Sequence, residues 1–246
     1  MVSFFKRVYR KLNWLISNTI EDVPYDFNLS NPLGDNGERV DILFNKEINF
    51  DKLDVYQKNH LKRYEFAKEK IDDGDVCGDF ACGTGYGSVI LADKAKWVTG
   101  ADLNKEVVNA ISERYQEYRN VTFLNENLLQ LNFTHQFDSI VSFETLEHFE
   151  EENIIKLLTI FSKALKDNGK FIFSTPYMQE QSEQAMKMGF HLTFYINEGK
   201  IASWLKTAGL ELELIKYQNY DTHNISNALT KKEFIICVAR KRTVNV

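Results

Sequence analysis

The sequence has few cysteines and prolines and no long apolar run, and each scarcity excludes a class of protein. Its three cysteines, Cys77, Cys82 and Cys237, lack paired spacing, so they predict core side chains in a reducing cytoplasm rather than disulfides or a zinc framework. No apolar run reaches the roughly 18 residues that a transmembrane helix needs, and no secretory signal is evident. The formal net charge of −5 argues against general affinity for nucleic acid. We therefore expect a cytoplasmic protein with no stable membrane span and no nucleic-acid partner.

Two of the three prolines lie within residues 1–50, a segment that differs from the rest of the chain. Residues 1–20 carry four basic and no acidic side chains, with apolar residues at helical spacing, which predicts an amphipathic helix. Such a helix could touch an anionic membrane, but its broad apolar face favours packing on the main domain or at a homodimer interface. Proline and Asn-Gly signals predict a loop or lid over 21–50. We expect residues 1–50 to form this helix and lid, and residues 51–246 to form the main domain.

Predicted helices and strands alternate through the main domain. Helical patterns cover residues 54–70, 86–94, 104–117, 151–166 and 197–208, with Asn168-Gly169 as the stop signal of the fourth helix. Strand-like apolar runs cover residues 76–81, 97–101, 121–124, 137–142, 170–174, 210–218 and 233–240. Alternation of this kind produces a parallel sheet, whereas the last two runs have no helix between them. We therefore expect a doubly wound α/β fold with a mostly parallel seven-stranded sheet and an antiparallel C-terminal strand pair.

Glycines are also few, twelve in all, yet Gly83, Gly85 and Gly87 alternate within a single turn between a predicted strand and a predicted helix. Glycines let the backbone pass close to a ligand, and the amides at the following helix N-terminus face that ligand. Asp102 ends the next predicted strand, where a carboxylate can accept hydrogen bonds from both ribose hydroxyls. The G-x-G-x-G spacing differs from the G-x-G-x-x-G of dinucleotide sites. The pattern predicts a nucleoside-containing cofactor; the alternative is a tight turn that binds no ligand.

The longer string D-x-A-C-G-T-G-Y-G, from Asp79 to Gly87, resembles motif I of the class I S-adenosylmethionine (SAM) methyltransferases. The resemblance covers about residues 54–240 and implies a Rossmann-like fold, SAM as cofactor and S-adenosylhomocysteine as product. It implies that Asp102 binds the ribose and Leu103 the adenine, while Asn127 lies where the family often has aspartate. The full set of implied cofactor-binding residues is Tyr64, Asp79, Ala81, Cys82, Gly83, Thr84, Gly85, Gly87, Asp102, Leu103, Asn127, Leu128 and Ser142.

Other stretches, 37–39, 60–67 and 174–177 followed by His191, resemble methyltransferases found among glycan and nucleotide-sugar genes. This narrower resemblance implies O-methylation of a sugar hydroxyl on a small-molecule substrate, a nucleotide-linked sugar or glycan precursor, and would place His60 and Tyr64 near the SAM carboxylate. Aromatic and polar side chains in 176–193 and 217–227 would suit such an acceptor. The alternatives are N- or O-methylation of another small metabolite, and a non-catalytic SAM-fold subunit that supports a partner.

Removal of a proton from a sugar hydroxyl calls for a general base. His148 follows the fourth predicted strand, and His191 lies in the irregular segment after the fifth, so both are expected at the carboxyl edge of the sheet, where such folds bind ligands. We predict His148, His191 and Glu147 as catalytic residues. The alternatives are a packing role for His148 and a surface-loop position for His191.

Glu144, Glu147 and His148 are spaced i, i+3 and i+4, which would place them on one helical face. With His191 they could bind a divalent metal such as Mg, Mn or Zn. The E-x-x-E-H pattern resembles the metal site of ubiquinone-pathway O-methyltransferases and of small-RNA 2′-O-methyltransferases. Many relatives carry a similar Glu-His pair without metal, so the metal-free interpretation is favoured and the metal ligands are left open.

Overall fold

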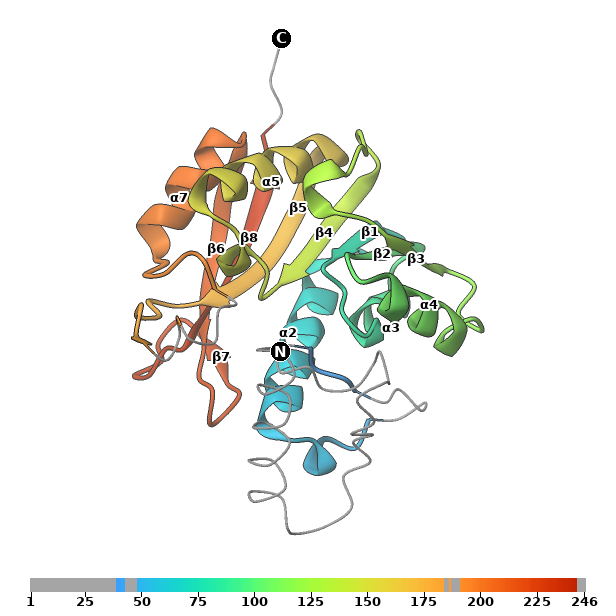
Figure 1. Ribbon diagram of the computed structural model, residues 1–246, viewed down its shortest axis with the longest axis horizontal. Helices are drawn as coiled ribbons and strands as arrows, with labels where there is room; N and C mark the ends of the chain where they lie inside the picture. Colours follow the sequence, from blue (N-terminus) through green and yellow to red (C-terminus); the bar gives the residue numbers. More distant parts are fainter. Residues whose placement is uncertain (1–38, 43–47, 184–185, 187–190, 243–246) are drawn as a thin grey trace.

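A computed structural model describes residues 39–42, 48–183, 186 and 191–242 (Figure 1). The predicted helix at 1–20 and most of the predicted lid at 21–50 lie outside these residues, so both stay predictions. Among the described residues, no helix combines the length and the apolar character needed to cross a bilayer.

The described strands form one mixed sheet in the order β3-β2-β1-β4-β5-β8-β6-β7. The strands are β1 (Val76–Phe80), β2 (Trp97–Asp102), β3 (Val121–Asn125), β4 (Phe137–Phe143), β5 (Leu165–Pro176), β6 (Leu210–Gln218), β7 (Ile225–Ser226) and β8 (Phe234–Lys241). Strands β1 to β5 are mutually parallel, and β8 runs antiparallel between β5 and β6. The α/β fold with an antiparallel C-terminal pair is thus confirmed. The expected count of seven was wrong by one, because the two-residue strand β7 adds to the edge of β6 and is too short to leave a sequence pattern.

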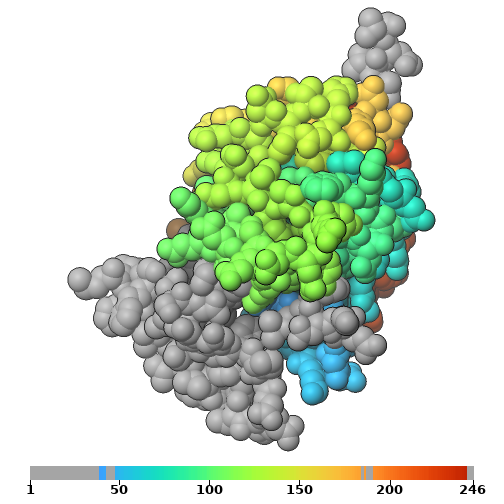
Figure 2. All heavy atoms as spheres, turned by 90° about the vertical axis from the view of Figure 1, so that its right-hand side faces the viewer, coloured from blue at the N-terminus to red at the C-terminus, as the bar shows by residue number. Residues whose placement is uncertain are grey.

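Helices cover both faces of this sheet. They are α2 (Val55–Lys70), α3 (Tyr86–Ala92), α4 (Lys105–Arg114), α5 (Glu151–Ala164) and α7 (Glu198–Thr207), with short 3₁₀ helices η1 (Phe50–Lys52), η2 (Leu128–Gln130) and η3 (Leu146–His148). Helices α5 and α7 share one buried cluster with the sheet, whereas α2 and α3 share another, and α4 packs beside α3. Edge strand β3 and helix α4, in green, face the viewer in Figure 2.

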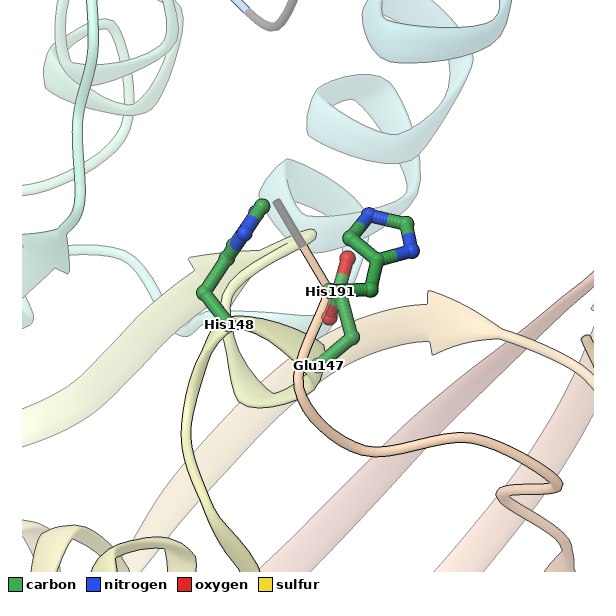
Figure 3. A group of neighbouring side chains, drawn as sticks. All are labelled: Glu147, His148 and His191. Carbon is green, nitrogen blue, oxygen red and sulfur yellow. The ribbon is translucent and has the colours of Figure 1, made fainter. Parts of the chain in front are cut away.

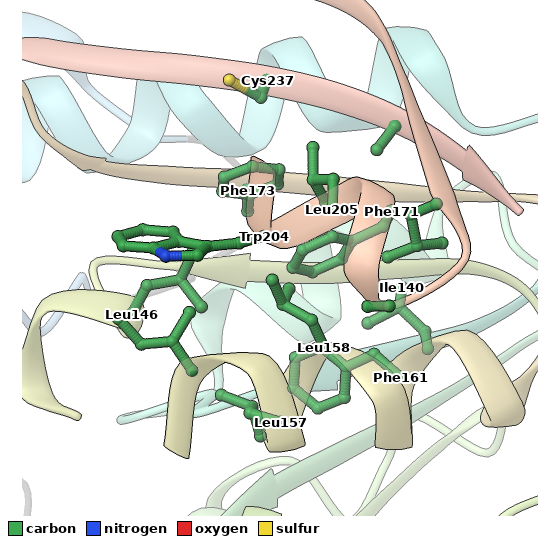
Figure 4. Close-up of a cluster of buried hydrophobic side chains, with 14 of the residues drawn as sticks. Ile140, Leu146, Leu157, Leu158, Phe161, Phe171, Phe173, Trp204, Leu205 and Cys237 are labelled. Atoms are coloured by element: carbon green, nitrogen blue, oxygen red, sulfur yellow. The ribbon is translucent and has the colours of Figure 1, made fainter. Parts of the chain in front are cut away.

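The larger core lies between the sheet and helices α5 and α7 (Figure 4). Phe171 and Phe173 of β5 stack with ring centroids 4.6 Å apart, and Trp204 of α7 is buried while its indole N–H donates to Glu151 at 2.9 Å. Buried aromatic rings contribute large apolar areas, and the indole donor keeps a partner. This core fixes β4 and β5, whose carboxyl ends support the site described below.

The predicted end of the fourth helix was wrong. Helix α5 ends at Ala164, and the chain is already extended at Leu165, which pairs with Phe137 of β4. The pairing register then shifts, so that Ser139 lies opposite Lys170. Asn168-Gly169 therefore forms part of an irregularity inside β5, with Asn168 at φ 61°, instead of a helix stop. Burial of Leu165 and its strand pairing outweigh the local turn signal.

Candidate active site

The glycine turn between β1 and α3 needs its glycines for packing as well as for ligand access. Gly83 and Gly85 have φ angles of 55° and 76°, which glycine adopts without strain. A Cβ on Gly87 would lie 2.0 Å from Cζ of Tyr64, so the aromatic ring covers the first turn of α3. Tyr64, on α2, and the turn are thereby brought together, whereas the predicted contact of Tyr64 with the cofactor stays a prediction.

Asp79, the last residue but one of β1, is fully buried beneath this turn. Its Oδ2 accepts a hydrogen bond from Ser88 Oγ at 2.6 Å, and its Oδ1 accepts one from Tyr64 Oη at 3.1 Å. Burial raises the pKa of Asp79 to about 6, although the two hydrogen bonds lower it. The carboxylate therefore joins β1, α2 and α3 around the turn.

This raised pKa predicts a pH-dependent cost of ionising Asp79. The folded chain binds the proton more tightly than the unfolded chain, so the contribution to stability is full below pH 3.8 and is lost as the pH rises through about 6. Relative to an Asp79→Asn variant, wild-type protein should lose about 3 kcal/mol of unfolding free energy between pH 3.5 and 7. Denaturant titrations of both proteins across that range measure the difference; a difference that does not vary with pH would contradict it.

Asp102, at the end of β2, contacts the glycine turn directly. Its Oδ2 accepts from the backbone N–H of Gly83 at 3.1 Å, and its Oδ1 accepts from Asn104 N–H at 2.9 Å. Each carboxylate oxygen has a further lone pair for a ligand hydroxyl. Leu103 beside it is 71% exposed, an unusual exposure for an apolar side chain at the end of a central strand. Asn127 caps η2 by accepting from Leu129 N–H.

Several of the predicted cofactor-binding side chains are used within the protein. The Thr84 hydroxyl donates to Val40 C=O, and the Ser142 hydroxyl donates to Phe80 C=O, while Cys82 is buried in the cluster between α3 and α4. Ala81 has a positive φ of 63° at the start of the turn, and Leu128 is buried in η2. A cofactor could therefore meet Thr84, Ser142 and Cys82 mainly through their backbone atoms.

Glu147, His148 and His191 come together beside the end of β4 (Figure 3). Glu147 and His148 belong to η3, and His191 lies after β5 in a segment held by hydrogen bonds from Leu192 and Thr193 N–H to Glu147 C=O. The rings of His148 and His191 are 5.1 Å apart. The structure thus places all three predicted catalytic residues in one cluster.

The carboxylate of Glu147 is buried, with 1% of the residue exposed. Its Oε2 accepts from Thr175 Oγ1 at 3.0 Å, whereas Oε1 has no hydrogen-bond partner among the described residues. Burial, with a further contribution from the charge of Glu144, raises the pKa of Glu147 well above its ordinary range. Burial and the neighbouring His148 lower the pKa of His191 to about 4, so that His191 is neutral at physiological pH.

The predicted helical face that includes Glu144 was wrong. Only Leu146–His148 form a helical turn, and Glu144 has a positive φ of 49°. Its backbone N–H donates to Ser174 C=O, and its carboxylate accepts from Ser174 Oγ at 2.6 Å and pairs with Arg63 at 3.2 Å. Strand pairing extends too far along β4 for a regular helix to begin at Glu144, so this side chain contacts Ser174 and Arg63 instead of sharing a helical face with Glu147 and His148.

Arg63 is the principal residue that the sequence did not reveal. It is 1% exposed, donates from Nε to Gln218 of β6 at 2.7 Å, and places its guanidinium 4.1 Å above the Phe234 ring. No motif distinguishes Arg63 from the other basic residues of α2. His60, one helical turn before Tyr64, has its pKa lowered by burial and then by Arg63.

Residues 78–169 match the family of methyltransferase domains. This segment holds the glycine turn, Asp102 and the Glu147–His148 pair on a doubly wound sheet. This part of the chain is similar to a methyltransferase domain. SAM is the cofactor of such domains. The partly buried Asp102 and the exposed Leu103 lie beside the glycine turn, where residues of these types could hold a nucleoside.

Known proteins resemble the chain mainly in this domain. A Mycolicibacterium smegmatis protein named "Probable S-adenosylmethionine-dependent methyltransferase" is 30% identical over 63% of this chain, which spans 59% of that relative's length. A chain from the complex between the Haloferax volcanii Trm112 methyltransferase activator and its methyltransferase has a TM-score of 0.63 at 18% identity, covering 76% of this chain and 92% of its own. N-methyltransferase NodS from Bradyrhizobium japonicum, solved with S-adenosylhomocysteine, has a TM-score of 0.60 at 16% identity. The match covers 78% of this chain and 90% of the NodS chain. The two solved structures confirm the fold of the methyltransferase domain and leave its acceptor open.

Proposed function

We propose that this protein is a SAM-dependent methyltransferase that methylates a hydroxyl of a sugar acceptor, a nucleotide-linked sugar or glycan precursor. The observation that carries the proposal is the position of the Glu147–His148–His191 cluster after β4, because β4 is the strand directly beside β1 and its glycine turn. Neighbouring parallel strands on either side of the point where the strand order reverses form the ligand crevice of this fold. A cofactor methyl group and an acceptor hydroxyl would thus meet between the turn and the cluster.

The cofactor half of the site would use residues that the fold brings to one edge. Asp102 would accept hydrogen bonds from the ribose hydroxyls, and the exposed Leu103 would pack against the adenine. The Asp79–Tyr64 pair would support the turn beneath the methionine part, and Asn127 would lie near the adenine. These roles extend the family resemblance with contacts that each side chain can make from its observed position.

Bound SAM supplies a methyl group on a sulfonium. The acceptor oxygen forms a bond to the methyl carbon while the carbon–sulfur bond breaks, and that electron pair stays on sulfur to give S-adenosylhomocysteine. The hydroxyl proton must leave as the new bond forms. One side-chain atom from each of Glu147, His148 and His191 lies within 4.8 Å of the other two, so this cluster would accept the released proton.

A second group of side chains supports a sugar acceptor. Tyr177 and Tyr217, at the carboxyl ends of β5 and β6, lie with ring centroids 5.2 Å apart, and both hydroxyls donate to Glu198. The Lys232 ammonium lies 3.7 Å from the Tyr217 ring centroid. Tyr217 is buried, so within this group the partly exposed Tyr177 ring would suit the apolar face of a sugar, and the Lys232 ammonium would suit the phosphates of a nucleotide-linked sugar.

N-methylation of a small metabolite is the second candidate, because the NodS neighbour is an N-methyltransferase. An amine acceptor loses its proton readily and has less need of the buried carboxylate and paired histidines seen here. A non-catalytic SAM-fold subunit is disfavoured, because the glycine turn and its link to Asp102 are intact.

Replacing Asp102 with alanine is expected to weaken SAM binding by about 1–3 kcal/mol, because the hydrogen bonds of a charged group are lost. Calorimetry of SAM with wild-type and variant protein measures this loss. Asp167→Ala, an exposed site at the opposite edge of the sheet, is the matched control and should leave affinity unchanged. Tight NAD binding without SAM binding would refute the assignment.

The acceptor is tested by SAM turnover against a panel of nucleotide sugars, free sugars and small amines. Turnover confined to sugar hydroxyls supports the proposal. Turnover of amines alone would replace it with N-methylation.

A further inference from the structure

We propose that Gln179 is a positioning residue of this site: it holds His191 in the tautomer that carries its proton on Nδ1 and its lone pair on Nε2. The use of that lone pair in methyl transfer rests on the proposed function, whereas the tautomer itself does not.

The contact between Gln179 and His191 determines where the ring proton lies. His191 Nδ1 is 2.6 Å from Gln179 Oε1. An amide oxygen accepts hydrogen bonds and cannot donate them, so Nδ1 donates. The ring is neutral at physiological pH, and in a neutral imidazole the hydrogen bond of one nitrogen decides which nitrogen carries the proton. Nε2 is therefore the nitrogen with the lone pair.

The two ring nitrogens of His191 face different surroundings. Nδ1 lies on the side of the ring away from His148, whereas Nε2 lies on the side of His148 (Figure 3). The two rings are 5.1 Å apart, and Glu147 completes the cluster, with one side-chain atom of each residue within 4.8 Å of the other two. The lone pair of Nε2 is thus on the cluster side of the ring, and the proton that Gln179 fixes is on the other side.

The irregular segment after β5 holds Gln179 in place through its backbone. Tyr195 N–H donates to Gln179 C=O at 3.0 Å, and Met178 N–H donates to Ile196 C=O at 2.9 Å. Met178 and Tyr195 have φ angles of 53° and 54°, a region that large side chains seldom adopt. Backbone strain of this kind is concentrated at functional sites, where the surrounding contacts maintain it. The two ends of the segment are therefore joined where Gln179 meets the ring that it orients.

A neutral amide suits this position better than a carboxylate would. Glu147 already brings one buried carboxylate to the cluster, and an acid beside His191 would favour a protonated ring without a lone pair. During methyl transfer the acceptor oxygen bonds to the methyl carbon, the carbon–sulfur bond breaks with its electron pair left on sulfur, and the hydroxyl proton passes to Nε2. The hydrogen bond from Nδ1 to Gln179 keeps the ring oriented as it gains a positive charge.

The tautomer is measured by NMR of full-length protein labelled with ¹⁵N-histidine, because protonated and unprotonated ring nitrogens differ in chemical shift. Spectra are recorded near pH 8.5, above the ordinary histidine pKa of about 6.5, and the signals of His191 are those absent from His191→Ala. We expect the proton on Nδ1 in wild type and in Gln179→Glu, which retains an accepting oxygen. Gln179→Leu has no acceptor, so a large share of the Nε2–H form should appear.

His135→Asn is the control, because this exposed histidine lies outside the cluster and asparagine tolerates its positive φ of 47°. It should leave the signals of His191 and the turnover unchanged.

Turnover with the best acceptor of the panel measures the consequence at the same pH. Gln179→Leu should lower kcat by about 10–100-fold, less than His191→Ala, because the required tautomer still forms part of the time. Gln179→Glu should retain most of the wild-type kcat. The KM for SAM should stay close to wild type in both variants, because the cofactor contacts are expected at the glycine turn and Asp102.

A proton on Nε2 in the wild-type protein would mean that the amide group of Gln179 donates to the ring, and this would overturn the proposal. A tautomer or a kcat that Gln179→Leu leaves unchanged would overturn it as well. If wild-type protein methylates no acceptor, the proposed function fails, and the NMR spectra still decide whether Gln179 fixes the tautomer of His191.

Discussion

His191→Ala is expected to lower kcat by about 10²–10⁴ while SAM affinity stays close to wild type. The physical reason is that His191 belongs to the cluster beside β4, whereas the cofactor contacts are expected at the glycine turn and Asp102. Loss of its lone pair would remove activation of the acceptor hydroxyl and leave cofactor binding intact. The measurement is steady-state turnover with the best acceptor from the sugar panel, together with calorimetry of SAM. His148→Ala should behave alike.

His135→Asn serves as the control for both variants and should retain wild-type turnover. Near-wild-type kcat in both alanine variants would contradict an active role for the cluster, and alignment of the reactants alone would then carry catalysis. Loss of SAM affinity parallel to the loss of turnover would instead indicate that the cluster supports the cofactor turn.

Arg63→Met should lower the unfolding free energy by about 3–5 kcal/mol, because it removes the cation of a buried pair and leaves Glu144 and Gln218 without their partner. The methionine preserves most of the apolar stem over Phe234, so the loss reports mainly on the charge and hydrogen bonds. For a chain of this size the midpoint of thermal unfolding should fall by roughly 6–20 °C. Denaturant titration of both proteins measures the free energy directly.

Arg242→Met is the matched control, because Arg242 pairs with Glu211 on the surface with more than half of each side chain exposed. Exposed pairs contribute about 0–1 kcal/mol, so this variant should be nearly neutral. A cost below 1 kcal/mol for Arg63→Met would contradict the view that this arginine joins α2 to Glu144 and β6.

The glycine turn and its link to Asp102 could be predicted from the sequence, because they depend on local residue patterns. The alternating glycines and the acid after the next strand predict a cofactor turn, and the structure connects the two through Gly83 and Asp102. Gly83 and Gly85 have positive φ angles, and the rings of Phe123 and Tyr64 leave no space for a Cβ on Gly85 and Gly87. The turn therefore requires glycine at these positions, which makes it recognisable in the sequence. Strand and helix alternation likewise predicts the parallel sheet, because side-chain periodicity is a local property.

Other predictions failed where tertiary contacts outweigh local signals. Asn168-Gly169 reads as a helix stop, yet buried Leu165 pairs with β4 before it. The Glu144, Glu147 and His148 spacing reads as one helical face, yet Glu144 is held by Ser174 and Arg63. In both cases a strand is longer than the sequence indicates: β5 begins before the predicted strand, and β4 ends after it. The neighbouring strands supply the hydrogen bonds that extend them, and no local sequence pattern reveals those bonds.

The sequence by itself determined the class of fold and the cofactor turn, since both depend on residue periodicity and on the backbone freedom of glycine. Only the tertiary structure decided which side chains meet. It brought His191 to Glu147 and His148 across more than forty residues of chain, buried Glu147 with one oxygen that has no hydrogen-bond partner among the described residues, and paired Glu144 with Arg63. The physical reason is that pairing between distant segments depends on the packing of the whole sheet and its helices, which spacing along the chain does not encode.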